Sequence, residues 1–536
     1  MAPTETYGSK QHGVYTRLSG AGVSSGEGGR RQPGVIIGRG NPDANDYEAG
    51  VVKSLELKSD IEAYFGSESE LGVQLEASLI NGASRPHLRG VAPEEISVTD
   101  EQLAGGSGTL SNAPILAQQS EVKATITDDA GTPADDADDT TTEYSVNFVY
   151  ETMPTAPSGD ADTVNINPNS GEFEGPTSDD YSISYKYHDW DAAIEAAAEV
   201  IQVAKVGGMC VTTSADSVKS TLSSYADEDT TNGPAIRHDY RLTFVLAPGM
   251  ANATGTDGSA VVDAEEYSDS IDNDAFFIAT GAHISESTGG QGALDAPLAS
   301  STPGIPHTVI GGVFGRMLGN QMTNPIYEDQ VEGYGDISLA TAFGRTEAQA
   351  LRDAETIPMM DSSRTLSGEI ELGGNHSTSS ATDYVRDFHR LTIKDNVNLN
   401  FLHLARAARS EILVTGEDGI ANETEQAGMD IFRRLAEQNI IEGAKEGQQG
   451  GQSGLESTQP AESTGTADEG GAAAGEQQTP YDVTVTNTDV DELTIEYEFV
   501  PTQVVKQVNN EGAIRDQVSF STAPGTAGSG TGTGGA

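Results

Sequence analysis

Cysteine and long apolar runs are almost absent from this chain of 536 residues, and each shortage excludes a class of protein. Cys210 is the only cysteine, so the chain can form no internal disulfide and no zinc cluster of several thiolates. Because Cys210 follows Val206-Gly-Gly-Met209 in an apolar run, we expect it to be a small buried hydrophobic residue. No apolar run approaches the roughly 18 residues that span a bilayer, and residues 1–13 lack the apolar segment of a secretory signal, so we expect no membrane insertion.

Basic residues are also scarce. The chain has 29 Lys and Arg, of which ten are Lys, against 83 Asp and Glu, and its formal net charge is −54. Without a basic stripe to displace counterions from phosphates, direct binding of nucleic acid is disfavoured. The acidic residues are spread along the whole length, as on the surfaces of proteins from extreme halophiles. Because molar salt shortens the Debye length to about 3 Å and screens this self-repulsion, we expect low salt to unfold or disassemble the protein.

Motifs that carry chemistry are missing as well. Gly38-Arg39-Gly40 could begin a dinucleotide fingerprint, but Asp43 occupies the place of the third glycine. No Walker A motif, H-E-x-x-H or G-x-S-x-G occurs. The acidic run 135–139 lacks the glycine and terminal Glu of an EF-hand, and His389 and His403 are expected to be partly buried or surface polar residues rather than ligands. We therefore expect no catalytic residue, no cofactor and no metal, and a protein that is not an enzyme.

Ordered material begins at Gly34, after a polar leader. Val35-Ile36-Ile37 is a short apolar run that predicts a buried strand. Helical spacing after it predicts a helix that is capped by Ser59 or Asp60 and stopped by Gly66. A second helix is predicted from Glu70 to Asn81-Gly82, with these residues on its buried face: Leu71, Leu75, Leu79 and Ile80.

Strand-like and helix-like segments then follow one another along the chain. The alternating runs 144–150 and 181–187 predict half-exposed strands, within a β-rich insertion at 93–188. A strong amphipathic helix follows, capped by Asp189 or Asp191. The remaining segments are predicted strands at 242–247, 275–279, 483–485, 493–499 and 513–520, a buried segment from Thr308, helices after Asp383 and Asn422, and a disordered loop at 447–479.

In this order, the segments resemble contractile tail sheath proteins of tailed viruses and of related injection machines. Each motif is short, and their common order along more than half of the chain carries the resemblance. The matching segments are Gly34–Gly38, Phe65-Gly66, Asn81-Gly82, Arg85–Arg89, Phe244–Gly249, Asp383–Arg390, Ala427–Gly443, Tyr481–Val483 and Leu493–Pro501. The insertion at 93–188 and the loop at 447–479 depart from the family core, and the family's Trp-containing segment near 340–360 is not recognisable.

The resemblance implies a multidomain α+β and α/β fold, in which helices flank a core of mixed sheet and extended arms lead away from both ends. The implied division is an arm at 1–33, core at 34–92, a β-rich insertion at 93–188, a middle α/β domain at 189–380, a C-terminal domain at 381–505, and an arm and tail at 506–536. Such subunits stack as rings, with hexamers expected, and contract without nucleotide to drive an inner tube through the host envelope.

The resemblance also implies inter-subunit contacts. Candidate arm strands contain Val14 and Tyr15 at one end and Val518 and Phe520 at the other, although these could also be frayed termini. The rare cations Arg433, Arg434 and Lys445 are candidates for contact with an acidic inner tube protein; Lys445 could equally compensate a helix dipole. The implied partners are further copies of this chain, the tube protein, and baseplate and tail terminator proteins. The implied place is a virion tail, assembled in the cytoplasm of a host such as a halophilic archaeon.

Two other classes fit parts of the sequence. A halophilic surface or adhesin-like protein would also be acidic, rich in Gly and Thr, and β-containing, but it should carry a secretion signal. A halophilic enzyme would need a convergent polar pocket, which the residue pattern does not indicate.

Overall fold

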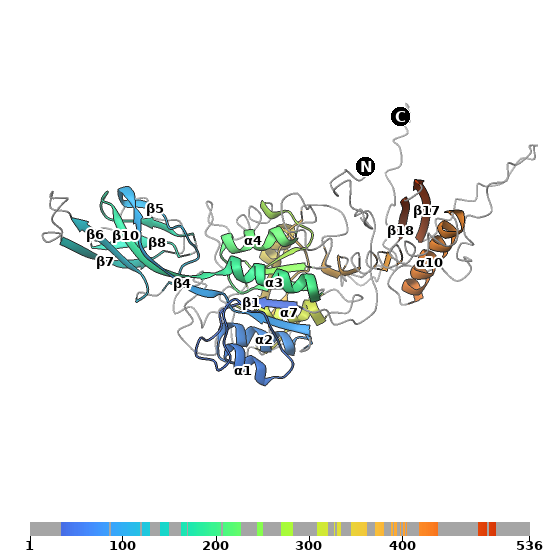
Figure 1. Ribbon diagram of the computed structural model, residues 1–536, viewed down its shortest axis with the longest axis horizontal. Helices are drawn as coiled ribbons and strands as arrows, with labels where there is room; N and C mark the ends of the chain where they lie inside the picture. Colours follow the sequence, from blue (N-terminus) through green and yellow to red (C-terminus); the bar gives the residue numbers. More distant parts are fainter. Residues whose placement is uncertain are drawn as a thin grey trace, which may run out of the picture.

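The computed structural model has an elongated shape, with a β-rich body at one end, an α/β body in the middle and a helix with a hairpin at the other end (Figure 1). The described residues are 34–84, 87–117, 120–128, 140–149, 162–168, 170–204, 207–226, 244–249, 270–281, 308–319, 326, 330–333, 345–361, 370–379, 387–389, 391–393, 397, 400–401, 404, 417–437, 481–489 and 492–499.

The middle body is built on a nine-stranded sheet with the order β14-β16-β15-β13-β12-β11-β1-β3-β2. Its six inner strands from β15 to β3 run parallel, while β2, β16 and β14 are antiparallel additions at the edges. The predicted strands at 35–37, 242–247 and 275–279 are confirmed. The bounds are β1 Gly34–Ile37, β2 Lys53–Ser54, β3 Leu88–Val91, β11 Gly208–Val211, β12 Phe244–Pro248, β13 Phe276–Thr280, β14 Gln330–Val331, β15 Ile357–Asp361 and β16 Ile370–Leu372.

Helices cover both faces of this sheet, which explains why its central strands are continuous apolar runs rather than alternating ones. One face carries α1 (Ser59–Phe65), α2 (Glu70–Ile80) and α7 (Ile310–Gly319), and the other carries α3 (Trp190–Ala204) and α4 (Asp216–Ala226) (Figure 1). Helix α8 (Arg345–Asp353) packs beside β15. Cys210 on β11 is completely buried, as predicted.

Three details of helix ends test the predicted boundaries. Asp189 is confirmed as the residue that caps α3, since its Oδ1 accepts the backbone N–H of Ala192 at 3.0 Å. Gly66 ends α1 with a φ of 77°, as predicted. The predicted cap of α1 is wrong: Lys58 occupies the N-cap position, and the Asp60 carboxylate instead accepts the N–H groups of the preceding turn, including that of Leu57 at 2.7 Å.

The predicted buried face of α2 is confirmed at Leu71 and Leu75, which are fully buried, but it is wrong at Ile80, which is 55% exposed. Ile80 is five positions after Leu75, so the two side chains point about 140° apart around the helix axis. Ile80 therefore lies off the face that packs on the sheet.

Helices α2 and α7 approach each other through small residues. Gly311 and Gly315 stand one turn apart on α7, and a Cβ added to them would lie 2.4 Å from the Gln74 carbonyl oxygen and 2.3 Å from the Ser78 carbonyl oxygen. The Gln74 side chain completes the contact: its Nε2 donates to the Thr308 carbonyl at 2.5 Å and its Oε1 accepts the Gly311 N–H at 2.7 Å. Backbone therefore meets backbone in this interface.

Aromatic side chains fill the centre of the middle body. Phe244 lies 5.0 Å from Phe388 and 5.5 Å from Phe314, measured between ring centroids, and Phe277 lies 5.6 Å from Phe388. All four are at most 1% exposed. The two pairs that Phe388 forms are edge-to-face, and pairs of this kind add about 0.5–1.5 kcal/mol each beyond their burial. The cluster joins strands, α7 and the segment that leads to the C-terminal body into one core.

The β-rich body is a seven-stranded sheet with the order β4-β10-β6-β7-β8-β9-β5, antiparallel except between β7 and β8. This sheet has its own apolar core. The chain passes from the middle body into it at Glu94 and returns at Asp189, and these two residues are opposite each other in the pairing of β4 with β10. The predicted strands at 144–150 and 181–187 are confirmed within it. The bounds are β4 Glu94–Leu103, β5 Ser107–Thr109, β6 Lys123–Asp128, β7 Thr140–Phe148, β8 Thr163–Ile166, β9 Glu172–Glu174 and β10 Tyr181–Asp189.

The C-terminal body consists of α10 (Glu417–Glu437) and the hairpin of β17 (Tyr481–Asp489) and β18 (Glu492–Phe499). Both predicted strands are confirmed, and the helix predicted after Asn422 begins earlier, at Glu417. A separate small core holds the body together, and its members are Ile393, Val397, Phe401, Ile431, Phe432, Leu435, Val483 and Val485. The predicted loop at 447–479 and strand at 513–520 lie outside the described residues.

Candidate functional site

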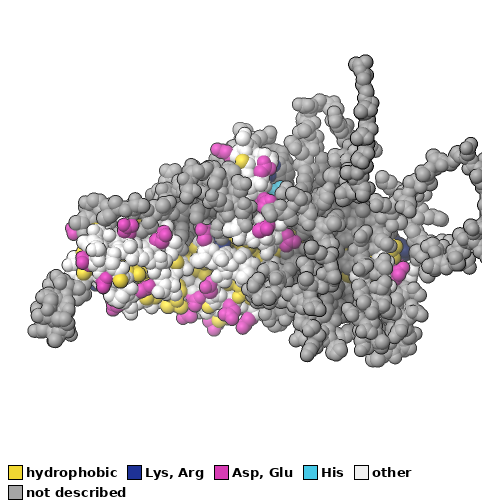
Figure 2. Space-filling view, turned by 90° about the horizontal axis from the view of Figure 1, so that it is seen from above, with side chains coloured by type: hydrophobic (Ala, Val, Ile, Leu, Met, Phe, Trp, Pro, Cys, Tyr) yellow, Lys and Arg dark blue, Asp and Glu magenta, His cyan; other side chains and the backbone are white. Residues whose placement is uncertain are grey.

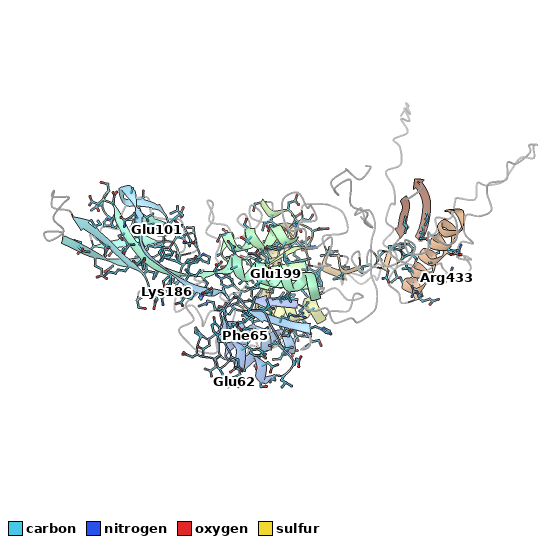
Figure 3. All side chains as sticks on the ribbon, in the orientation of Figure 1. Glu62, Phe65, Glu101, Lys186, Glu199 and Arg433 are labelled. Atoms are coloured by element: carbon cyan, nitrogen blue, oxygen red, sulfur yellow. The ribbon has the colours of Figure 1, made fainter. Side chains whose placement is uncertain are left out.

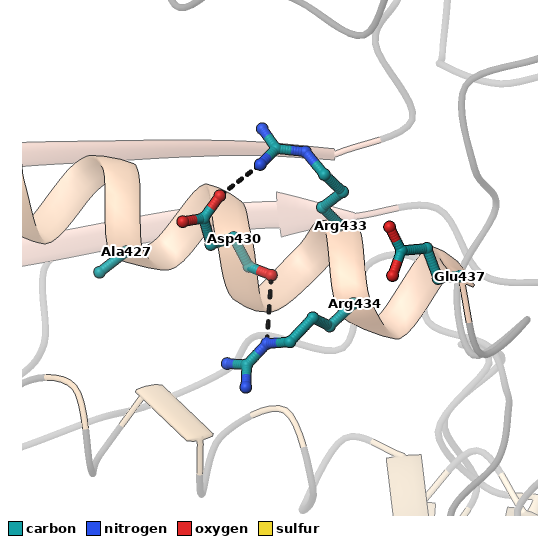
Figure 4. Close-up of a pocket in the computed structure, with 5 residues that line it drawn as sticks. All are labelled: Ala427, Asp430, Arg433, Arg434 and Glu437. Atoms are coloured by element: carbon teal, nitrogen blue, oxygen red, sulfur yellow. Dashed lines mark hydrogen bonds and ion pairs between the residues drawn. The ribbon is translucent and has the colours of Figure 1, made fainter.

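Two of the three cations predicted to contact a partner lie on the exposed face of α10. Arg433 and Arg434 border an open groove of 480 Å³ together with Ala427, Asp430 and Glu437 (Figure 4). All five lining residues come from this one helix, so the groove is a surface depression and not an enclosed pocket. Lys445 lies outside the described residues.

The charges in this groove are balanced. Asp430 forms an ion pair with Arg433, and its backbone carbonyl accepts a hydrogen bond from Arg434 Nε at 3.4 Å (Figure 4). Glu437 supplies a second carboxylate beside the two guanidinium groups. The side chains of Arg433 and Asp430 are 56% and 61% exposed, so water screens the pair and both groups remain accessible to a partner.

The buried face of α10 fixes the direction of this exposed face. Phe432 is fully buried and its ring centroid lies 5.1 Å from that of Phe401, while a Cβ added to Gly428 would lie 2.9 Å from Val483 on β17. Arg433 and Arg434 follow Phe432 directly, so the helical repeat points them away from that core. One face of α10 thus packs against the hairpin, and the opposite face, with Arg433 and Arg434, is exposed to solvent.

The hairpin beside α10 has two strand edges that no described strand occupies. A two-stranded hairpin alone is marginally stable, and packing on α10 provides its described support. The predicted arm strands that could add to such an edge, with Val14, Tyr15, Val518 and Phe520, lie outside the described residues.

A second place to look for a ligand site is the switch point of the parallel sheet, between β1 and β11, where ligands bind in many α/β folds. Arg39, just after β1, forms an ion pair with Glu70 at 2.8 Å, and the two side chains are only 15% and 6% exposed. Burial raises the pKa of Glu70, and Arg39 opposes that rise. An internal ion pair, largely shielded from solvent, thus occupies the position that a ligand takes elsewhere.

The surroundings of Arg39 are equally closed. Burial, together with the nearby Arg39 charge, lowers the pKa of His188 to about 3, so its imidazole is neutral near pH 7. A Cβ on Gly38 would lie 2.8 Å from Thr212 Cγ2, and the Gly38 N–H donates to Val91 at 3.2 Å. Gly38-Arg39-Gly40 therefore works as a structural turn. The sequence did not indicate Glu70 as the partner of Arg39, because 31 residues separate them.

A third polar cluster lies where the chain leaves the middle body. His376 Nδ1 lies 2.9 Å from Asp387 Oδ1, and His389 Nδ1 lies 3.2 Å from Asn375 Nδ2. His389 is 1% exposed, so it is buried more deeply than predicted, because Phe388 beside it joins the aromatic core. The cluster fastens the segment that leads toward the C-terminal body. His403 lies outside the described residues.

Within the described part of the chain, no group of three or more His, Cys, Asp or Glu side chains is arranged to hold a metal ion. Among the same residues, no helix is both long enough and apolar enough to cross a membrane.

No protein-family model matches the chain, and no curated protein matches it in sequence. Solved structures similar to it include the sheath tail protein from Desulfitobacterium hafniense (TM-score 0.42, 10% identity, 80% of this chain and 90% of that chain). Two further similar chains come from the anti-feeding prophage, one from its six-fold symmetrised baseplate (TM-score 0.46, 10% identity, 95% and 99%) and one from its contracted helical sheath (TM-score 0.45, 11% identity, 96% and 99%). Because all three TM-scores are below 0.5, the case for a function rests on the chain's own residues.

Proposed function

We propose that this chain is a structural subunit of a contractile tail sheath, which stacks as rings around an inner tube and drives it through a host envelope. The observation that carries the proposal is the placement of the motif segments. Gly34–Gly38 and Phe244–Gly249 are far apart in the sequence, yet they contribute strands to one sheet on either side of β11, and Phe65-Gly66 ends a helix that covers this sheet. Closed polar clusters, rather than open clefts, occupy the described polar interior, which suits a building block.

Neighbouring subunits are proposed to connect by strand addition. The open edges of the β17–β18 hairpin are suitable acceptors, because an added strand satisfies backbone groups through main-chain hydrogen bonds. The proposed donors are the arms 1–33 and 506–536, through Val14 and Tyr15 or Val518 and Phe520. Such a connection permits rigid-body rotation of the bodies during contraction while the subunits stay linked.

The inner tube is proposed to contact the exposed face of α10. Arg433 and Arg434 are accessible, and a tube carboxylate would replace the Asp430 carboxylate as the partner of Arg433 and the Asp430 backbone carbonyl as the partner of Arg434. We propose that Lys445 also contacts the tube. The β-rich sheet lies at the opposite end of the molecule from Arg433, so in such an assembly it would face away from the tube (Figure 3).

The finer features of the proposal follow from the sequence resemblance, except the halophilic host, which follows from the acidic composition. They are the division into 34–92, 93–188, 189–380 and 381–505, hexameric rings, the baseplate and tail terminator partners, a virion tail assembled in the host cytoplasm, and a halophilic host. Dialysis tests the last of these. A halophilic protein should disassemble or unfold in roughly 10 mM salt, where the Debye length is about 30 Å; full stability there would contradict it.

Electron microscopy of the protein expressed and kept in high salt tests the assembly. Tubes or stacked rings are expected, and monomers under all salt conditions would overturn the sheath proposal. Deleting 1–20 or 513–536 should abolish polymers while circular dichroism still reports a folded body. If polymers survive both deletions, strand addition by the arms is wrong even if the sheath assignment holds.

A further inference from the structure

The long edge strand of the β-rich sheet carries an unusual combination of features. Strand β4 spans ten residues at one end of the sheet, pairs with β10 on its inner side, and has no described strand partner on its outer side. The opposite edge strand, β5, is only three residues long. An exposed ten-residue edge is a template for any incoming strand unless something blocks it.

The first block is a bulge. Pairing with β10 is regular from Glu94 to Val98, then slips so that two residues of β4, Thr99 and Asp100, stand opposite Ser184. Asp100 has a φ of 56°, which is uncommon for a residue other than glycine. Its N–H donates to Ser184 Oγ at 3.1 Å, and its carboxylate accepts a hydrogen bond from Ser182 Oγ at 3.3 Å. Two serines of β10 thus fix the kink, which interrupts the straight ladder that a new strand needs.

The second block is charge. Glu94, Glu95 and Asp100 are exposed on β4. Only two basic residues, Lys123 and Lys186, occur between Glu94 and Asp189, against 20 acidic ones. Lys186 is already held by Glu95 and Glu121, both at 2.9 Å, and Lys123 by Glu143 at 3.6 Å. Lys186 (labelled in Figure 3) therefore pairs with one carboxylate of the edge, Glu95, and among the described residues no Lys or Arg forms an ion pair with Glu94 or Asp100.

We propose that the bulge and carboxylates of β4 guard this edge against strand addition by other copies of the chain. When the β4 edges of two copies pair, directly opposed side chains stand about 4.5–5.5 Å apart, so the carboxylates of the two copies would be desolvated beside each other. The proposed sheath makes such a guard necessary, because it presents many arm strands and many edges at high local concentration. Strand β17, by contrast, carries no charged residue from Val483 to Thr488.

The test removes the guard in steps. The full variant is Glu94→Thr, Glu95→Thr with deletion of Asp100, which restores regular pairing of Thr99 with Ser184. Light scattering should show association beginning at about tenfold lower protein concentration than in the wild type, a factor that corresponds to about 1.4 kcal/mol. Hydrogen exchange should show new protection of the amides of 94–99 in the associated form, which identifies β4 as the edge that pairs.

A charge-matched control separates the edge from net charge. Asp162→Thr with Glu172→Thr and Asp179→Thr also removes three exposed acids from this sheet but leaves β4 unchanged, so it should stay as dispersed as the wild type. A folded full variant that stays dispersed, or associates without new protection of β4, would overturn the proposal. If deletion of Asp100 prevents folding, the Glu94→Thr, Glu95→Thr variant decides by the same two measurements.

The guard and the sheath can fail separately. Scattering and exchange are measured on protein in solution, whether or not tubes form, whereas the sheath proposal is judged from tubes in the electron microscope. If the wild type forms no tubes but the full variant associates through β4, the proposal of the guard stands and the sheath proposal is wrong.

Discussion

The nine-stranded and seven-stranded sheets differ in where their polar groups lie. The central strands of the first are buried on both faces: β1, β11 and β12 have every residue buried. The second alternates, as in β10, and exposes acidic side chains over its surface (Figure 2). Parallel strands need covering helices on both faces, whereas an antiparallel sheet can leave one face in water.

This difference separates what each body depends on. The middle body depends on close packing, which salt and pH affect little, and its tightest place is the contact of α2 with α7. The β-rich body has a smaller core and depends more on hydrogen bonds that involve carboxylates, such as those of Glu101. Changes in packing should therefore act most strongly on the first body, and changes in charge most strongly on the second.

The largest expected effect comes from Gly315→Leu. A side chain at this position would collide with the Ser78 carbonyl, 2.3 Å from the new Cβ, and neither helix backbone can move without disturbing the sheet. We expect a loss of about 3 kcal/mol or more in the free energy of unfolding, at the upper end of overpacking effects. Chemical denaturation followed by circular dichroism would measure it.

Ser220→Leu is the matched control for this change. Ser220 is an exposed residue of α4, on the opposite face of the same sheet, and the same substitution there should stay within about 0.5 kcal/mol. Equal destabilisation by both variants would show that the α2–α7 contact has no special role.

The α2–α7 contact also shows how far the sequence could predict the fold. Apolar runs such as Val35–Ile37 identify strands, because burial on both faces leaves a local pattern. The hydrogen bond of Gln74 to Thr308 leaves none, since 234 residues separate its partners. The four-residue spacing of Gly311, Gly315 and Gly319 was the available signal for close helix packing.

The candidate site was predictable to a similar degree. Arg433 and Arg434 were found because cations are rare in this chain, and rarity is visible in a sequence. Their contacts with Asp430 depend on the helix that places the three together, and the Asp100 bulge depends on strand register, since 84 residues separate Asp100 from Ser184. Contacts that tertiary structure creates could not be found from composition or spacing.

The next effect should appear in the β-rich body, with Glu101→Gln. Glu101 accepts hydrogen bonds from the Tyr185 hydroxyl at 2.7 Å and from the Ser111 N–H at 2.7 Å. An amide offers one acceptor where the carboxylate offers two, so we expect a loss of about 1 kcal/mol after discounting for partial exposure. Hydrogen exchange of peptides within 94–189 should accelerate, while peptides of 34–84 keep their rates. Asp179→Asn, an exposed change in the same sheet, is the control and should alter neither.

A smaller effect should distinguish the bodies by pH. Burial raises the pKa of Glu70, so the folded protein binds this proton more readily than the unfolded chain does. The middle body therefore gains stability as the pH falls from the raised pKa of Glu70 toward the usual Glu pKa of about 4.3. Although burial opposes it, hydrogen bonds from Tyr185 and Ser111 lower the pKa of Glu101. The β-rich body therefore loses that contribution as pH falls below about 4.3.

Exchange rates of each body between pH 3.5 and 7, compared with those of Glu70→Gln and Glu101→Gln, measure the two contributions. Each variant should remove the pH dependence of its own body only. Both bodies responding with the same sign, or either variant acting on the other body, would contradict the assignment.

The smallest effect on stability, with the largest effect on assembly, is expected at α10. Arg433→Ala with Arg434→Ala removes an exposed ion pair, and such pairs contribute at most about 1 kcal/mol. The melting temperature should therefore barely change, while binding to the proposed acidic tube should weaken, most strongly at low ionic strength where surface charges are least screened. Lys58→Ala with Lys123→Ala removes two other exposed cations, whose side chains are 68% and 57% exposed, and should leave tube binding intact. Equal loss in both variants would mean that tube binding responds to net charge alone; no loss in either would remove α10 from the interface. Only a selective loss at α10, with stability unchanged, identifies a surface used for contact rather than for folding.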